Sequence, residues 1–268
     1  MPEFVTYPRW LAGEDAVPAS SRAATTRAAT PTRSRPALWL WAVFLGWQLA
    51  YMMLRLASAD TIPRTYGSKE VERVLFGGTL PATWLQDTLY DGLPLANWDW
   101  YAVVVYFSMS VLPFALALVL TVFRSRELPA FLLALTIAHA LGALGHIIAP
   151  VLAPWRFIDL GTVHGIVHEL LRGSSAVEAA LLAPAFTPFS PPMLAATIVG
   201  LAVGRSGWLG RLWGGAWIGS AALSLVYLGE RYVVDAVAGM LVGFLVWHVS
   251  QAIWGYFDWR AGNRPAAA

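Results

Sequence analysis

Six long apolar stretches, separated by more polar segments of which two are long, constrain the fold of this chain more than any other feature of its sequence. Hydrophobic residues make up 57% of the 268 residues and charged residues only 13%, about half the roughly 25% typical of soluble domains. A soluble domain of this length could not bury so much apolar surface, whereas lipid covers it in a bilayer. A helix needs roughly 20 residues to cross the hydrocarbon. The sequence therefore predicts an all-α integral membrane protein with six transmembrane helices, over residues 37–57, 100–123, 128–152, 191–206, 209–228 and 232–256.

The segments outside these spans predict the domain organisation and the orientation. Residues 1–36 hold too little apolar surface to fold alone and are expected to form a disordered cytoplasmic tail. Residues 37–257 are expected to form the six-helix transmembrane domain, and residues 258–268 a short cytoplasmic tail. Arginine is more frequent in the segments on the side of the N-terminus, which by the positive-inside rule places both termini in the cytoplasm. On the outer side, residues 164–183 predict an amphipathic helix lying on the membrane surface.

The fourth span is short and starts in a proline-rich stretch. Proline is tolerated in the first helical turn, so this helix is expected to begin below the membrane surface with Ser190 as its N-cap. Small residues recur in two later spans, at Gly214-Gly215-Ala216 and from Gly239 to Gly243. Such runs predict close helix packing, either within the bundle or with a partner protein.

Composition and motifs exclude several classes of function. The 18 basic residues are 17 arginines and Lys69, and they lie between the spans rather than in one patch, which argues against nucleic-acid binding. The chain has no cysteine, so thiolate metal sites are excluded. His164 and His168 have the i, i+4 spacing of metal ligands, but no third ligand is suitably spaced. His139 and His146 are seven residues apart and face the same way on the third span. We predict no metal and no cofactor.

Ionisable groups at membrane depth are costly and therefore point to function. Arg231 and Asp235 are four residues apart and share a helix face, with Glu230 in the adjoining loop. They form either a structural ion pair or part of a site. Arg156 follows two prolines and a tryptophan at the outer interface, where it either binds a lipid phosphate through its guanidinium or snorkels to the surface.

Three segments resemble the signatures of one enzyme superfamily. The stretch Leu-Val-Tyr-Leu-Gly-Glu230-Arg231-Tyr-Val-Val-Asp235-Ala-Val-Ala-Gly is similar to the last signature of the type 2 phosphatidic acid phosphatases, in their inositol phosphorylceramide synthase-like branch. The stretch from Ala149 to Arg156 and the sequence Phe-Ser-Pro-Pro-Met193 resemble two further signatures of that branch. The resemblance covers about residues 37–257 and implies a six-helix bundle whose site faces the outer leaflet.

The resemblance also implies that the usual chemistry is lost. In the family, a histidine of the last signature accepts the phosphoryl group, an aspartate orients it, and a second histidine protonates the leaving group. Here Arg231 occupies the position of the nucleophile and Met193 that of the acid, and Pro191 replaces the motif serine. A guanidinium stays protonated and cannot act as nucleophile, and methionine cannot donate a proton. Asp235, Ser224 and Arg156 are retained.

Two functions are compatible with these residues. The first is a non-hydrolytic protein that binds a lipid-linked phosphate, polyprenyl or phospholipid, or serves as accessory subunit of a membrane complex, with Arg156 and Arg231 as phosphate-binding residues. The second is an enzyme acting on such a phosphate with a different residue set, in which Asp235 and Glu230 are the catalytic candidates. The residues expected to line the common pocket are Ser190, Met193, Ser224, Tyr227, His146 and His164. A transporter is disfavoured because the spans contain no inverted repeat.

Overall fold

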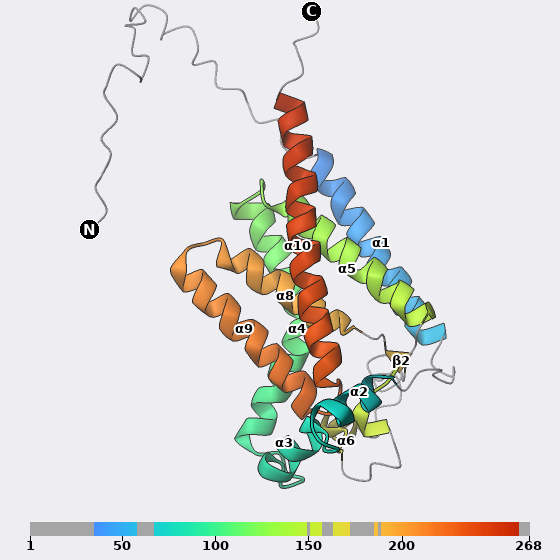
Figure 1. Cartoon of the computed structure of the whole chain (residues 1–268). Helices are drawn as coiled ribbons and strands as arrows, with labels where there is room; N and C mark the ends of the chain where they lie inside the picture. Colours follow the sequence, from blue (N-terminus) through green and yellow to red (C-terminus); the bar gives the residue numbers. More distant parts are fainter. Residues whose placement is uncertain are drawn as a thin grey trace, which may run out of the picture. The chain divides into compact units, whose positions relative to one another are not determined.

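The computed structural model describes residues 35–57, 67–148, 151–156, 163–171, 185–186 and 189–262 of the chain (Figure 1). Within these residues the fold is helical, apart from one antiparallel pair of two-residue strands. The helices are α1 (Arg35–Ala57), α2 (Gly67–Leu75), α3 (Pro81–Leu89), α4 (Asn97–Phe123), α5 (Leu128–Ile148), the 3-10 turn η3 (Pro154–Arg156), α6 (Ile166–Leu171), α8 (Pro191–Gly204), α9 (Trp208–Tyr227) and α10 (Val233–Gly262). The strands are β1 (Val151–Leu152) and β2 (Ala185–Phe186).

Three helices in the described residues are long and apolar enough to cross a membrane. They are α4, α5 and the Val233–Phe257 part of α10, and two shorter apolar helical stretches cover Leu38–Leu54 and Pro191–Gly204. This finding supports a membrane-embedded protein. Six crossings stay a prediction, because α8 has only 14 residues and therefore spans about 21 Å of a hydrocarbon core roughly 30 Å thick.

Each of the six predicted spans coincides with a helix, but two of the ends differ by four residues or more. The third span was expected to reach residue 152, whereas α5 ends at Ile148 and is followed by β1. The last was expected to end at residue 256, whereas α10 continues to Gly262. A helix can extend into water beyond its apolar part because its backbone hydrogen bonds are internal. Most of the N-terminal tail, residues 1–34, lies outside the described residues.

Helix α8 is the centre of the bundle and packs against α4, α5, α9 and α10. Its close neighbours approach through glycines. A Cβ built at Gly214 of α9 would lie 2.2 Å from the backbone oxygen of Gly200 in α8. Likewise, a Cβ at Gly243 of α10 would lie 2.9 Å from the oxygen of Leu194. The small-residue runs therefore serve packing within the bundle, where they let helix backbones come into contact.

The start of α8 is capped as the sequence predicts. The side chain of Ser190 accepts a hydrogen bond from the N–H of Met193 at 3.3 Å, and two prolines occupy the first turn. Ser190 is fully buried, so no water can replace this acceptor.

Replacing Ser190 with alanine should lower the free energy of unfolding by about 1 kcal/mol, the usual value of an N-cap hydrogen bond. The shift is measurable as a lower melting temperature in detergent. Ser206→Ala is the matched control, because Ser206 is exposed and bonds only to the carbonyl of Val203 at the opposite end of α8. Equal melting temperatures for the two variants would contradict the assigned cap.

One end of the bundle carries the short elements. Helix α2 packs against α10, and α3 packs against α9, as the lower part of Figure 1 shows. The surface helix expected over residues 164–183 corresponds in part to α6, which has six residues. The rest of that prediction, residues 172–183, lies outside the described residues.

Candidate functional site

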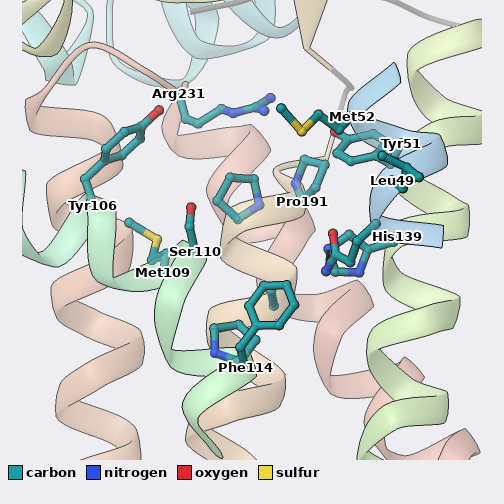
Figure 2. Close-up of a pocket in the computed structure, with 14 residues that line it drawn as sticks. Leu49, Tyr51, Met52, Tyr106, Met109, Ser110, Phe114, His139, Pro191 and Arg231 are labelled. Atoms are coloured by element: carbon teal, nitrogen blue, oxygen red, sulfur yellow. Dashed lines mark hydrogen bonds between the residues drawn. The ribbon is translucent and has the colours of Figure 1, made fainter. Parts of the chain in front are cut away.

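A cavity of about 490 Å³ lies among α1, α4, α5 and α8. Most of its lining is apolar, with a few polar side chains placed around it (Figure 2). The lining residues are Gln48, Leu49, Tyr51, Met52, Tyr106, Met109, Ser110, Pro113, Phe114, His139, Pro191, Pro192, Ala195 and Arg231. An apolar cavity of this size with a small number of polar groups is the usual form of a ligand site.

Arg231 is the one charged residue in this lining. Its side chain reaches across one end of the cavity, with Tyr106 on one side and Tyr51 and Met52 on the other (Figure 2). The residue is only 3% exposed. A guanidinium presents a planar fork of donors that matches the oxygens of a phosphate or carboxylate, so this end of the cavity suits an anionic group.

The turn between α9 and α10 holds Arg231 in place. Its backbone N–H donates to the oxygen of Leu225 at 3.1 Å. Gly229 has a φ of 73°, and a Cβ there would lie 2.7 Å from the oxygen of His164, so the turn requires glycine. The buried amide of Gln86 in α3 donates to the oxygens of His164 and Tyr227, at 2.9 and 2.7 Å. The turn is thus tied to two neighbouring segments.

A neutral polar pair faces the same cavity. The Nδ1 atom of His139 lies 2.6 Å from the oxygen of Leu135, and its Nε2 lies 2.9 Å from the amide nitrogen of Gln48. Because a carbonyl oxygen can only accept, Nδ1 carries the proton, and Nε2 accepts from Gln48. The carbonyl oxygen of the Gln48 side chain is then oriented by this chain of bonds. The pair joins α1 to α5, and it also places a fixed polar group on the cavity wall.

Buried carboxylates lie beside Arg231. Asp235, in the first turn of α10, is 2% exposed, and its Oδ1 accepts a hydrogen bond from Ser68 of α2 at 2.6 Å. Glu230 is 1% exposed. The positive charge of Arg231 lies within electrostatic range of Asp235. Asp235 is therefore held by the hydroxyl of Ser68 at Oδ1, in addition to the nearby charge of Arg231.

Glu72 of α2 is a further buried carboxylate at this place. It is fully buried, and it accepts a hydrogen bond from the N–H group of Val233 at the start of α10. Burial raises the pKa of Glu72 from its ordinary 4.5 to about 7, and the nearby charge of Asp235 acts in the same direction. Glu72 therefore caps α10 from a different segment of the chain, and it titrates near neutral pH.

The structure places the other predicted pocket residues outside this lining. Ser190 and Met193 are fully buried where α8 meets α10, and a Cβ at Gly239 would lie 3.1 Å from that of Met193. Tyr227 donates a hydrogen bond to Asp99 of α4. These side chains support the helices around the cavity and do not face it.

Ser224, His146 and His164 also lie away from the lining. Ser224 and His146 are buried in α9 and α5. His164 is half-exposed, and its Nδ1 lies 3.1 Å from Glu169. Arg156 belongs to η3, and its side chain lies outside the described residues.

The two histidines with chelating spacing have separate partners. His164 pairs with Glu169, whereas His168 stacks on Trp155 with ring centroids 4.8 Å apart. Among the residues that the structure describes, no group of three or more histidine, aspartate or glutamate side chains could hold a metal ion.

The sequence analysis missed Ser68, Glu72, Gln48 and Tyr106. Ser68 and Glu72 have the i, i+4 spacing of one helix face, which was a usable signal. Gln48 is polar within an apolar span, and such residues point to function by default. Ser68 bonds to Asp235, 167 residues away, and Gln48 bonds to His139, 91 residues away. No local pattern in the sequence identifies these partners.

Comparison with known proteins adds no further assignment, because no family model, curated protein or solved structure matches this chain.

Proposed function

We propose that this chain is a membrane protein that binds a lipid-linked phosphate, polyprenyl or phospholipid, without hydrolysing it. The observation that carries the proposal is the buried guanidinium of Arg231 at one end of an apolar cavity formed by four helices of the bundle. The guanidinium suits the phosphate, and the apolar walls suit the first part of a hydrocarbon chain. The volume of about 490 Å³ lies within the range of small-molecule sites.

The residues around the cavity support the proposed absence of hydrolysis. Arginine stays protonated at any working pH and cannot accept a phosphoryl group. Met193, which takes the position of the acid in the resemblance, is buried against α10 and does not line the cavity. We therefore propose a degenerate site in a bundle of the type 2 phosphatidic acid phosphatase kind.

The proposal includes six membrane crossings, both termini in the cytoplasm, and a site that faces the outer leaflet. The arginine bias of the sequence supports this orientation. Arg231 lies between α9 and α10, at the end of the bundle that also carries α2 and α3. A protein with this role is suited to act as an accessory subunit that presents the bound lipid to an enzyme or transporter.

An enzyme is the second candidate, and the cluster of buried carboxylates favours it. Asp235, Glu230 and Glu72 surround the turn that bears Arg231. A carboxyl group with a pKa of about 7, as in Glu72, is well matched to general acid–base chemistry at neutral pH. In this case the chain would release phosphate, and Asp235→Asn would abolish the release.

The test is a binding and hydrolysis experiment on the full chain in nanodiscs, with phosphatidate and a polyprenyl phosphate as probes. We expect binding, detected by native mass spectrometry, and no release of phosphate. Arg231→Gln should weaken binding by about 10- to 100-fold, because a hydrogen bond to a charged group contributes about 1.5–3 kcal/mol.

Arg126→Gln is the matched control, since Arg126 is exposed in the turn between α4 and α5. This variant should bind both probes with the affinity of the native chain. Unchanged affinity in Arg231→Gln would contradict the proposed site. Phosphate release by the native chain would replace the binding function with the enzymatic one.

A further inference from the structure

We propose that α2 is a membrane-surface helix. One face, formed by Val71, Val74 and Leu75, lies in the lipid, and the opposite face packs against the end of the bundle that carries Arg231. The inference needs only a membrane-embedded bundle and does not depend on the proposed ligand. The partner is the boundary between lipid head groups and acyl chains in the adjacent leaflet.

The first argument is the inverted arrangement of polar and apolar residues on α2. Residues at i, i+3 and i+4 share one helix face, and here that face is apolar and outward. Val71 is 49% exposed, Val74 82% and Leu75 65%. The polar residues Lys69 and Glu72 are instead buried against the protein. A helix in contact with water on its outer side would have the opposite arrangement.

The buried polar face has defined partners in the bundle. Glu72 accepts the N–H of Val233, and Ser68 donates to Asp235 at 2.6 Å. Both partners lie in the first turn of α10, two and four residues after Arg231. Ser68 and Glu72 are thus bonded to α10, and these bonds keep the face formed by Val71, Val74 and Leu75 turned outward.

The second argument is the level of α2 along the bundle. The apolar span of α10 begins at Val233, the residue whose N–H Glu72 accepts. Helix α2 therefore lies at the N-terminal boundary of the apolar span of α10, beside the lower end of α10 in Figure 1. Hydrocarbon gives way to head groups at this level, and amphipathic helices bury their apolar faces about 5–10 Å deep there.

Exposed tryptophans mark the same end of the bundle. Trp98 and Trp100 lie at the start of α4, and both are exposed. The hydrogen bond from Tyr227, at the end of α9, to Asp99 places the start of α4 beside the start of α10. Tryptophan is enriched at membrane interfaces. The apolar face of α2 is thus at the height of an aromatic belt, where lipid is the expected neighbour.

Site-directed spin labelling tests this inference directly, because the native chain has no cysteine. Single labels are placed at Val74→Cys and Val71→Cys on the apolar face. Arg73→Cys and Glu70→Cys, exposed on the charged flank of the same helix, are the matched controls. Collision rates with oxygen, which concentrates in lipid, and with a water-soluble nickel chelate are measured in nanodiscs.

We expect higher oxygen and lower nickel accessibility at positions 74 and 71 than at positions 73 and 70. Equal nickel accessibility at all four positions would show that α2 is surrounded by water and would overturn the inference. Protection of position 74 from both reagents, with a short spin–spin distance between chains, would assign this face to a second copy and would overturn it as well.

Discussion

Replacing Gly214 with alanine is expected to lower the stability of the bundle more than any other single substitution considered for this protein. The added Cβ would lie 2.2 Å from the backbone oxygen of Gly200, so that α8 and α9 must move apart. Overpacking of this kind costs about 3 kcal/mol or more when backbone, rather than a flexible side chain, must yield. For a chain of this size the melting temperature should fall by about 6 to 12 °C.

The neighbouring glycine provides a matched control for this experiment. Gly215 lies on the same helix, and a Cβ there meets no atom within 4 Å. Gly215→Ala should leave the melting temperature unchanged or raise it, because alanine favours a helix over glycine by about 1 kcal/mol. Unfolding in detergent is followed by the fluorescence of the 14 tryptophans. Equal melting temperatures of the two variants would contradict the close α8–α9 contact.

The second large effect is a pH dependence that originates at Glu72. Its pKa is about 7 in the folded protein and 4.5 ordinarily, so between these values the folded state holds a proton that the unfolded state has released. Stability from this group is therefore fully present below about pH 4.5, falls as the pH rises, and is lost above about pH 7. The difference corresponds to about 3 kcal/mol.

Glu72→Gln should remove this part of the pH dependence. The glutamine oxygen can still accept the N–H of Val233, and its amide cannot ionise. We expect the melting temperature of the native protein to fall between pH 5 and pH 8, and that of Glu72→Gln to fall less. Glu70→Gln, exposed on the same helix, should follow the native curve. If the melting temperature of Glu72→Gln fell with pH as steeply as that of the native protein, Glu72 would not titrate in this range.

The positions of the long apolar helices could be predicted from the sequence. Apolar runs of about 20 residues can bury their surface only in lipid or in a helix bundle, and backbone hydrogen bonds within lipid must be satisfied inside each helix. The cap at Ser190 and the close packing at Gly214 and Gly243 followed from equally local patterns. Each of these predictions depends on residues that are neighbours in the chain or on one helix face.

The residues that surround the turn bearing Arg231 could not be predicted in the same way. Ser68 meets Asp235 across 167 residues, and Glu72 meets Val233 across 161. The sequence singled out Arg231 and Asp235 because they are charged at membrane depth, but it offered no reason to place α2 against them. The sequence analysis also placed Met193 in one pocket with Arg231. In the structure, Met193 instead packs against Gly239 in the contact between α8 and α10.

The sequence by itself determined that this is a helical chain suited to a membrane, and it marked the start of α10 as unusual. The tertiary structure decided that a cavity lies behind Arg231, that a neutral Gln48–His139 pair faces it, and that α2 turns its polar face inward. The physical reason is that hydrophobicity and helix periodicity act over a few turns. Buried polar groups instead find their partners wherever packing brings distant segments together.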